Sequence, residues 1–128
     1  VDFHPDAWAD DARMLSWLIS MASGKPITED MIRGGHADAE TAISAISPLA
    51  HVGPGSVPTI LAYGDRDDLV RPVHRDKLSA ALAAHGVPHE VIRFPRSDHM
   101  LWHDPDSTDA YEQAALAYAH RYFTAEPQ

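Results

Sequence analysis

The amino-acid sequence predicts an α/β protein whose parallel β-sheet is joined by crossover helices and preceded by a helical segment. Apolar residues recur at helical spacing through the first part of the chain. From Val57 onward, two short apolar runs alternate with two longer helical patterns. Strands that alternate with helices in this order favour a parallel sheet with right-handed crossovers.

Residues 1–47 are expected to form the helical segment. Apolar residues at three- and four-residue steps predict a first helix, which Gly24 ends. A short helix is expected over Thr28–Ile32, with Thr28 as its N-cap, and a third helix over about Ala37–Ile46. The buried face of the first helix is expected to include Trp8, Met14 and Trp17.

Residues 48–128 are expected to form the strand–helix–strand–helix part. Val57–Tyr63 is a short apolar run closed by Gly64, which is typical of a buried strand. Pro72 is expected to begin the helix that follows, and Gly86 to cap its end.

The second strand–helix pair completes the pattern. His89–Phe94 is expected to be the next strand, and Asp109 with Glu112 forms a capping pair for the final helix. Two strands, or three if Val1–Phe3 is the end of another, make an incomplete parallel sheet. We therefore expect further strands to come from upstream sequence or from a second copy of the chain.

The composition excludes several classes of function. Asp and Glu outnumber Lys and Arg by 19 to 10, and the net charge of −9 argues against a nucleic-acid partner. The absence of cysteine excludes disulfides, thiolate metal sites and a cysteine nucleophile within this chain. No apolar stretch approaches the ~18 residues that a membrane span needs. We expect no cofactor and no metal, and the compartment is left open.

Polar side chains follow both predicted strands at the point where each strand ends. The segment Gly64–Pro72 carries Asp67, and the segment Ser97–Met100 carries His99. The carboxyl ends of parallel strands meet at one edge of a sheet, so these two loops are expected to lie close together. A carboxylate on one ring nitrogen of His99 would fix the tautomer and leave the other nitrogen free to take a proton from a nucleophile.

These motifs resemble the C-terminal part of an α/β-hydrolase of the esterase, lipase and prolyl-oligopeptidase-like group. Three features match in order: the segment Ser47-Pro48-Leu49, the strand-Gly-x-x-Asp-x-x-Val turn, and a loop after the next strand that ends in Asp-His. The resemblance implies that Asp67 is the acid and His99 the base of a catalytic triad. It also implies that residues 1–47 correspond to a cap or lid.

The chain departs from this family in lacking the nucleophile elbow, Gly-x-Ser-x-Gly. Ser56 comes closest, but Pro54 and Pro58 stand where the glycines belong, and Ser56 precedes a strand instead of following one. The nucleophile, the oxyanion hole and the first strands are therefore expected to precede Val1. The 128 residues alone are expected to be inactive.

The resulting functional hypothesis is a serine hydrolase of the carboxylesterase or lipase type. The chain would supply Asp67 and His99 and hydrolyse carboxylic esters once completed by the upstream half or by a second copy. A peptidase of the prolyl-oligopeptidase-like group is an alternative. A non-catalytic fragment that dimerises or binds a partner is another.

Other interpretations of single motifs compete with this hypothesis. Asp65-Arg66-Asp67 resembles the nucleophile motif of haloacid-dehalogenase-like phosphatases, although Gly64 separates it from the strand. Asp104–Asp109 resembles the start of a calcium loop, but Asp109 stands where glycine is required. The rival triad acids, Asp65 and Asp68, are expected to be solvated or to cap the turn. The residues expected to pack in the interior after the histidine are Met100, Leu101 and Trp102.

Overall fold

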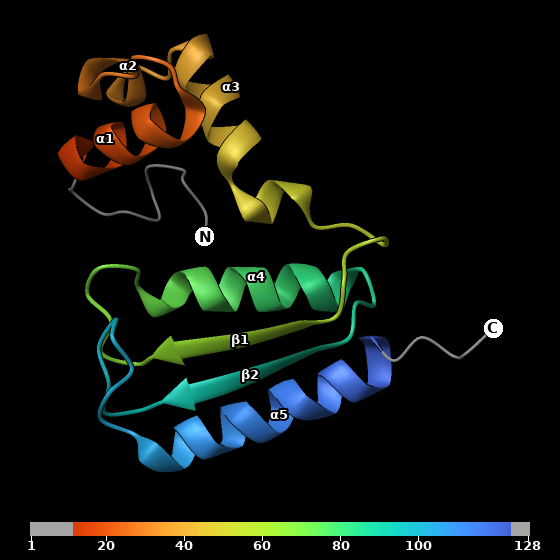
Figure 1. The fold of residues 1–128 in the computed structure, drawn as a ribbon. Helices are drawn as coiled ribbons and strands as arrows, with labels where there is room; N and C mark the ends of the chain where they lie inside the picture. The colour runs from red at the N-terminus through yellow and green to blue at the C-terminus, as the bar shows by residue number, and fades with distance from the viewer. Residues whose placement is uncertain (1–11, 124–128) are drawn as a thin grey trace. The chain divides into compact units, whose positions relative to one another are not determined.

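The computed structural model describes residues 12–123 (Figure 1). The chain divides into two compact units, Val1–His51 and Val52–Gln128, and each is considered by itself. The expectations for Val1–Phe3 and Trp8 lie outside the described residues.

The first unit is helical. It contains α1 (Ala12–Ser23), α2 (Glu29–Arg33), α3 (Ala37–Ile46) and a short 3-10 helix, Pro48–His51. Thr28 is the N-cap of α2, as predicted, and its side chain accepts a hydrogen bond from the backbone N–H of Met31. The predicted bounds of α3 are confirmed.

The three helices of this unit pack around a small apolar core. Its members are Leu15, Ile19, Ile27, Ile32, Ala39, Ala42 and Ile43. The prediction that Trp17 is buried is wrong, because its exposed fraction is 60%. Leu15 and Ile19 define the inner face of α1, and Trp17 lies about 200° around the helix from Leu15, on the opposite face.

The second unit has the predicted strand–helix–strand–helix order. Its elements are β1 (Thr59–Gly64), α4 (Pro72–Ala84), β2 (His89–Phe94) and α5 (Pro105–Phe123). The two strands pair in parallel, from Thr59 opposite His89 to Gly64 opposite Phe94. Figure 1 shows α4 on one face of this sheet and α5 on the other. The predicted α/β class with a parallel sheet is confirmed.

Alternate side chains of the strands supply the core of each face. The α4 face contains Leu61, Leu82 and Val87, with Val52, Leu78 and Val91 packed against them. The α5 face contains Ile92, Phe94 and Ala114, with Ile60, Ala62 and Leu101 packed against them. The sheet is therefore covered on both faces, and its parallel pairing places the carboxyl ends of β1 and β2 at the same edge.

The ends of the two helices of this unit test two further predictions. Gly86 follows α4 with a φ of +65°, and the N–H of Val87 bonds to the carbonyl of Leu82, so the predicted glycine cap is confirmed. The predicted start of the last helix at Asp109 is wrong, since α5 begins at Pro105. Proline is favoured in the first turn because it needs no acceptor there, and the carbonyl of Asp104 accepts the first bonds of the helix. Over residues 12–123, no helix is long and apolar enough to cross a membrane.

Candidate active site

Asp67 lies in the tight turn that follows β1. Its backbone N–H donates to the carbonyl of Gly64 at 3.2 Å. Its side chain is only 4% exposed, and Oδ1 accepts hydrogen bonds from the backbone N–H groups of Leu69 at 2.9 Å and Val70 at 2.8 Å. The turn therefore fixes this carboxylate in one orientation and leaves Oδ2 for another partner.

That partner is His99, in the loop that follows β2. The distance from His99 Nδ1 to Asp67 Oδ2 is 2.8 Å. The imidazole is 48% exposed, and within residues 12–123 its side chain makes no other hydrogen bond. The structure therefore brings together the two residues that the strand-end motifs single out.

This contact determines which nitrogen of His99 can act as a base. A carboxylate only accepts hydrogen bonds, so Nδ1 carries the proton in the neutral imidazole. Nε2 then keeps its lone pair and is the nitrogen able to accept a proton. The arrangement is chemically suited to remove a proton from a hydroxyl group.

The loops after β1 and β2 cross at very close range. The backbone N–H of Arg66 donates to the carbonyl of Ser97 at 3.0 Å, and that of Asp65 donates to Phe94 at 3.0 Å. A Cβ atom on Gly64 would collide with the carbonyl oxygens of Ser97 and Asp98. The absence of a side chain at Gly64 is what lets the two loops approach each other.

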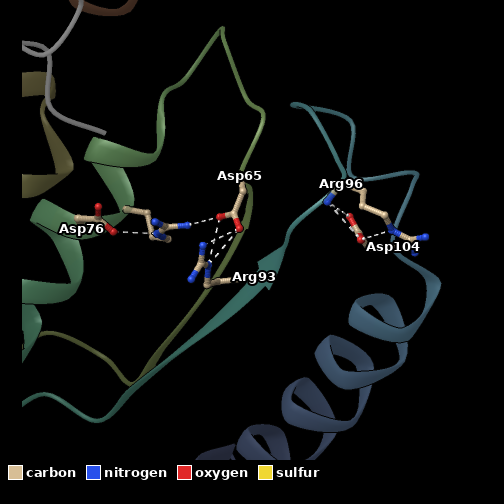
Figure 2. Close-up of polar contacts among 6 residues, drawn as sticks. Asp65, Asp76, Arg93, Arg96 and Asp104 are labelled. Carbon is tan, nitrogen blue, oxygen red and sulfur yellow. Dashed lines mark hydrogen bonds and ion pairs between the residues drawn. The ribbon is translucent and has the colours of Figure 1, made fainter.

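Asp65 is bound by two arginine side chains instead of being solvated or capping the turn, contrary to the prediction. Its Oδ1 accepts from Arg75 Nη1 at 2.8 Å, and Arg93 binds the carboxylate through Nε and Nη2 at 3.1 and 2.7 Å (Figure 2). The hydrogen bond from Arg93 and then the one from Arg75 lower the pKa of Asp65 against the opposing effect of burial. This ion-pair cluster joins the end of β1 to β2 and α4. Asp68 is exposed, as expected.

The Asp65 cluster predicts a pH-dependent stability. A depressed carboxyl pKa stabilises the fold above the unfolded value of about 4 and loses that contribution as the pH falls through the folded value. The melting temperature of Asp65→Asn should thus lie below that of wild type at pH 7, and the gap should narrow as the pH falls below the unfolded value of about 4. Thermal unfolding by circular dichroism measures this gap, and Asp68→Asn is the matched control. A gap that stays constant across this range would contradict the prediction.

The loop after β2 contains two exposed apolar side chains beside His99. Met100 is exposed and Trp102 is 75% exposed, so the prediction that both pack in the interior is wrong. Leu101 alone packs against the α5 face of the sheet, with a φ of 60° that is unusual for a residue with a branched side chain. This backbone conformation turns one apolar residue inward and leaves its two neighbours outside.

A cavity of about 540 Å³ is lined by residues of both loops: Arg66, Arg96, Asp98 and His103. The sequence did not predict this cavity, and it pointed to Asp104 only as the start of a segment resembling a calcium loop, not as a buried carboxylate. Asp104 is held by Ser97 and Arg96, so its oxygens are occupied by hydrogen-bond donors. Across the described part of the chain, no group of three His, Asp or Glu side chains is placed to hold a metal ion.

Comparison with known proteins adds one finding to this geometry. Residues 7–126 match the model of the prolyl oligopeptidase family. The chain belongs to the prolyl oligopeptidase family. A search of curated proteins found no match to it.

Membership of the prolyl oligopeptidase family confirms the resemblance to an α/β-hydrolase. The prolyl oligopeptidase family consists of serine hydrolases, and the parallel sheet with helices on both faces agrees with its fold. The match covers α1, α2 and α3 as well as both strands.

Proposed function

We propose that Asp67 and His99 are the acid and base of a Ser-His-Asp triad that hydrolyses carboxylic esters. The observation that carries the proposal is the 2.8 Å hydrogen bond from His99 Nδ1 to a carboxylate whose other oxygen is already fixed by two backbone N–H groups. The family match supports the general class of serine hydrolase.

The proposed mechanism follows from the protonation of His99. Nε2 takes the proton of a serine hydroxyl as its oxygen attacks the ester carbonyl carbon. The imidazolium that forms is stabilised by Asp67, and it gives its proton to the alcohol oxygen as the ester C–O bond breaks, which leaves the acyl group on the serine. Water, deprotonated by Nε2 in the same way, then releases the carboxylic acid and restores the serine.

Ser56 is a poor source of the nucleophile. It lies before β1, whereas His99 follows β2, and the two strands run in parallel. The six residues of β1 span about 20 Å, which separates Ser56 from the end of the sheet that carries His99. Its hydroxyl instead accepts a hydrogen bond from the backbone of Gly53.

The nucleophile is therefore proposed to come from an upstream segment of the same protein or from a second copy. The 128-residue sequence contains no Gly-x-Ser-x-Gly motif. Within residues 12–123, β1 and β2 pair only with each other, so each strand keeps one edge with unpaired backbone groups. Such edges can accept the further strands that would bring a nucleophile elbow to His99.

The lid role of residues 1–47 stays a prediction.

Peptide hydrolysis is the second candidate, because the matching family is described as one of oligopeptidases. The two candidates use the same triad and differ in the leaving group. A phosphatase with Asp65 as nucleophile fits less well, because both Asp65 oxygens are bound by arginine side chains. A non-catalytic interaction fragment would show no turnover of any of these substrates.

The test is a paired assay on the intact protein that contains these residues. We expect it to hydrolyse a nitrophenyl ester and to be labelled on a serine by a fluorophosphonate, with His99→Ala abolishing both. A proline-containing peptide nitroanilide, assayed beside the ester, separates esterase from peptidase. The 128-residue chain alone should do neither. The proposal fails if the intact protein is neither labelled nor active on either substrate.

A further inference from the structure

A buried carboxylate closes the loop that carries His99. Asp104 lies immediately before α5, and its side chain is 4% exposed. Oδ2 accepts from the hydroxyl of Ser97 at 2.6 Å. The two contacts with Arg96 appear in Figure 2: its backbone N–H donates to Oδ2 at 3.0 Å, and its Nε donates to Oδ1 at 3.0 Å. The two ends of the loop are thereby joined around a single carboxylate.

Ser97 extends this network toward the other loop of the site. The residue is fully buried, and its Oγ accepts from the backbone N–H of His103 at 3.0 Å while donating to Asp104. Its carbonyl accepts from the N–H of Arg66, the residue before Asp67. Asp104 is thus connected through Ser97 to the backbone beside both members of the Asp67–His99 pair.

The contacts of Asp104 are those of a buried charged group, not of a surface ion pair. Burial raises the pKa of Asp104, but the hydrogen bonds from Ser97 and Arg96 outweigh it, so the pKa lies below its ordinary value. A buried carboxylate favoured in its charged form holds its donors in place, because any donor that moved away would leave a buried charge unsatisfied.

The imidazole of His99 has few contacts of its own. It is half exposed and, in the described residues, is held only by the hydrogen bond to Asp67. A loop whose two ends are joined has fewer conformations than an open one. The contacts of Asp104 therefore hold the part of the loop that carries His99 at a defined distance from the turn that carries Asp67. Asp104 is not within this contact and acts on it only through Ser97 and the backbone.

We propose that Asp104 is a positioning residue for His99: through Ser97 it fixes the loop so that His99 Nδ1 remains within hydrogen-bond distance of Asp67 Oδ2. The effect on turnover rests on the proposed function. The effect on the hydrogen bond does not, because it can be measured without any substrate.

The direct test is the tautomer of neutral His99, read from the ¹⁵N chemical shifts of its ring nitrogens. Free neutral imidazole side chains favour the proton on Nε2, whereas the contact with Asp67 requires it on Nδ1. We expect the Nδ1–H tautomer in wild type and a shift toward Nε2–H in Asp104→Asn. The matched control is Asp106→Asn, an exposed carboxylate in the first turn of α5, which should leave the tautomer unchanged.

Activity of the intact protein gives a second readout. Asp104→Asn should lower kcat about 10- to 100-fold, because small displacements of a catalytic group have effects of that size, with KM within about twofold of wild type. Asp104→Glu, which keeps the charge, should recover part of the loss. If the wild type itself is inactive, the proposed function fails, and the tautomer still decides the role of Asp104.

A further variant keeps the proposal testable if Asp104→Asn does not fold. Ser97→Ala removes the hydroxyl that links Asp104 to His103 but leaves the carboxylate paired with Arg96. It should shift the tautomer in the same direction. The proposal is overturned if a folded Asp104→Asn or Ser97→Ala protein keeps the Nδ1–H tautomer of wild type.

Discussion

Replacing Asp67 with asparagine should lower kcat of the intact protein by about 10⁴-fold while leaving the fold in place. Asparagine has nearly the same shape, and its amide oxygen can still accept from the backbone of Leu69 and Val70. The group facing His99 then becomes an N–H donor. It can bond only to an unprotonated Nδ1, which puts the proton on Nε2 and removes the base.

The neighbouring residue provides the matched control for this variant. Asp68→Asn changes the charge by the same amount, but Asp68 is exposed, so its kcat should stay within about twofold of wild type. Circular dichroism and thermal unfolding establish that both variants are folded. Retained activity in Asp67→Asn together with its loss in Asp68→Asn would identify Asp68 as the acid and contradict the proposal.

The approach of Asp67 to His99 could be predicted because it follows from topology alone. Both residues come a few positions after the end of a strand, and the carboxyl ends of parallel strands share one edge of the sheet. The helix pattern and the glycine after α4 are also local signals, read within one turn of chain. Such local features can be predicted from the sequence without knowing which other elements pack against them.

The parts that escaped prediction depend on contacts among several elements. Asp65 meets Arg93 only because the strand register places Arg93 opposite Tyr63, and it meets Arg75 only because α4 packs beside β1. A sequence pattern shows that these charges exist but does not place them opposite one another. Asp104 likewise accepts hydrogen bonds from Ser97 and Arg96, which the fold of the loop brings back beside it from seven and eight residues away.

The second large loss of kcat is expected from Gly64→Ala, which adds one methyl group at the end of β1. Gly64→Ala places Cβ against the carbonyl oxygens of Ser97 and Asp98 and 2.9 Å from the carbonyl carbon of Asp98. These are backbone atoms of the His99 loop, so relief requires that the loop itself moves. Since Asp67 stays in its turn after β1, we expect the His99–Asp67 hydrogen bond to break and kcat to fall at least about 100-fold.

The same variant should also lose about 1–3 kcal/mol in the free energy of unfolding, the usual cost of forcing a group into a packed site. Denaturant unfolding measures this loss, and kcat is compared at a temperature where both proteins are folded. The control is Gly55→Ala, in the same unit, where an added Cβ meets nothing within 4 Å. If Gly64→Ala matched the control in both kcat and stability, the two loops would not need their close crossing, and the site would be more adaptable than its geometry implies. A large loss of kcat with little loss of stability would instead show that the strain is relieved by the His99 loop alone, which is the element that the proposed mechanism requires to be held still.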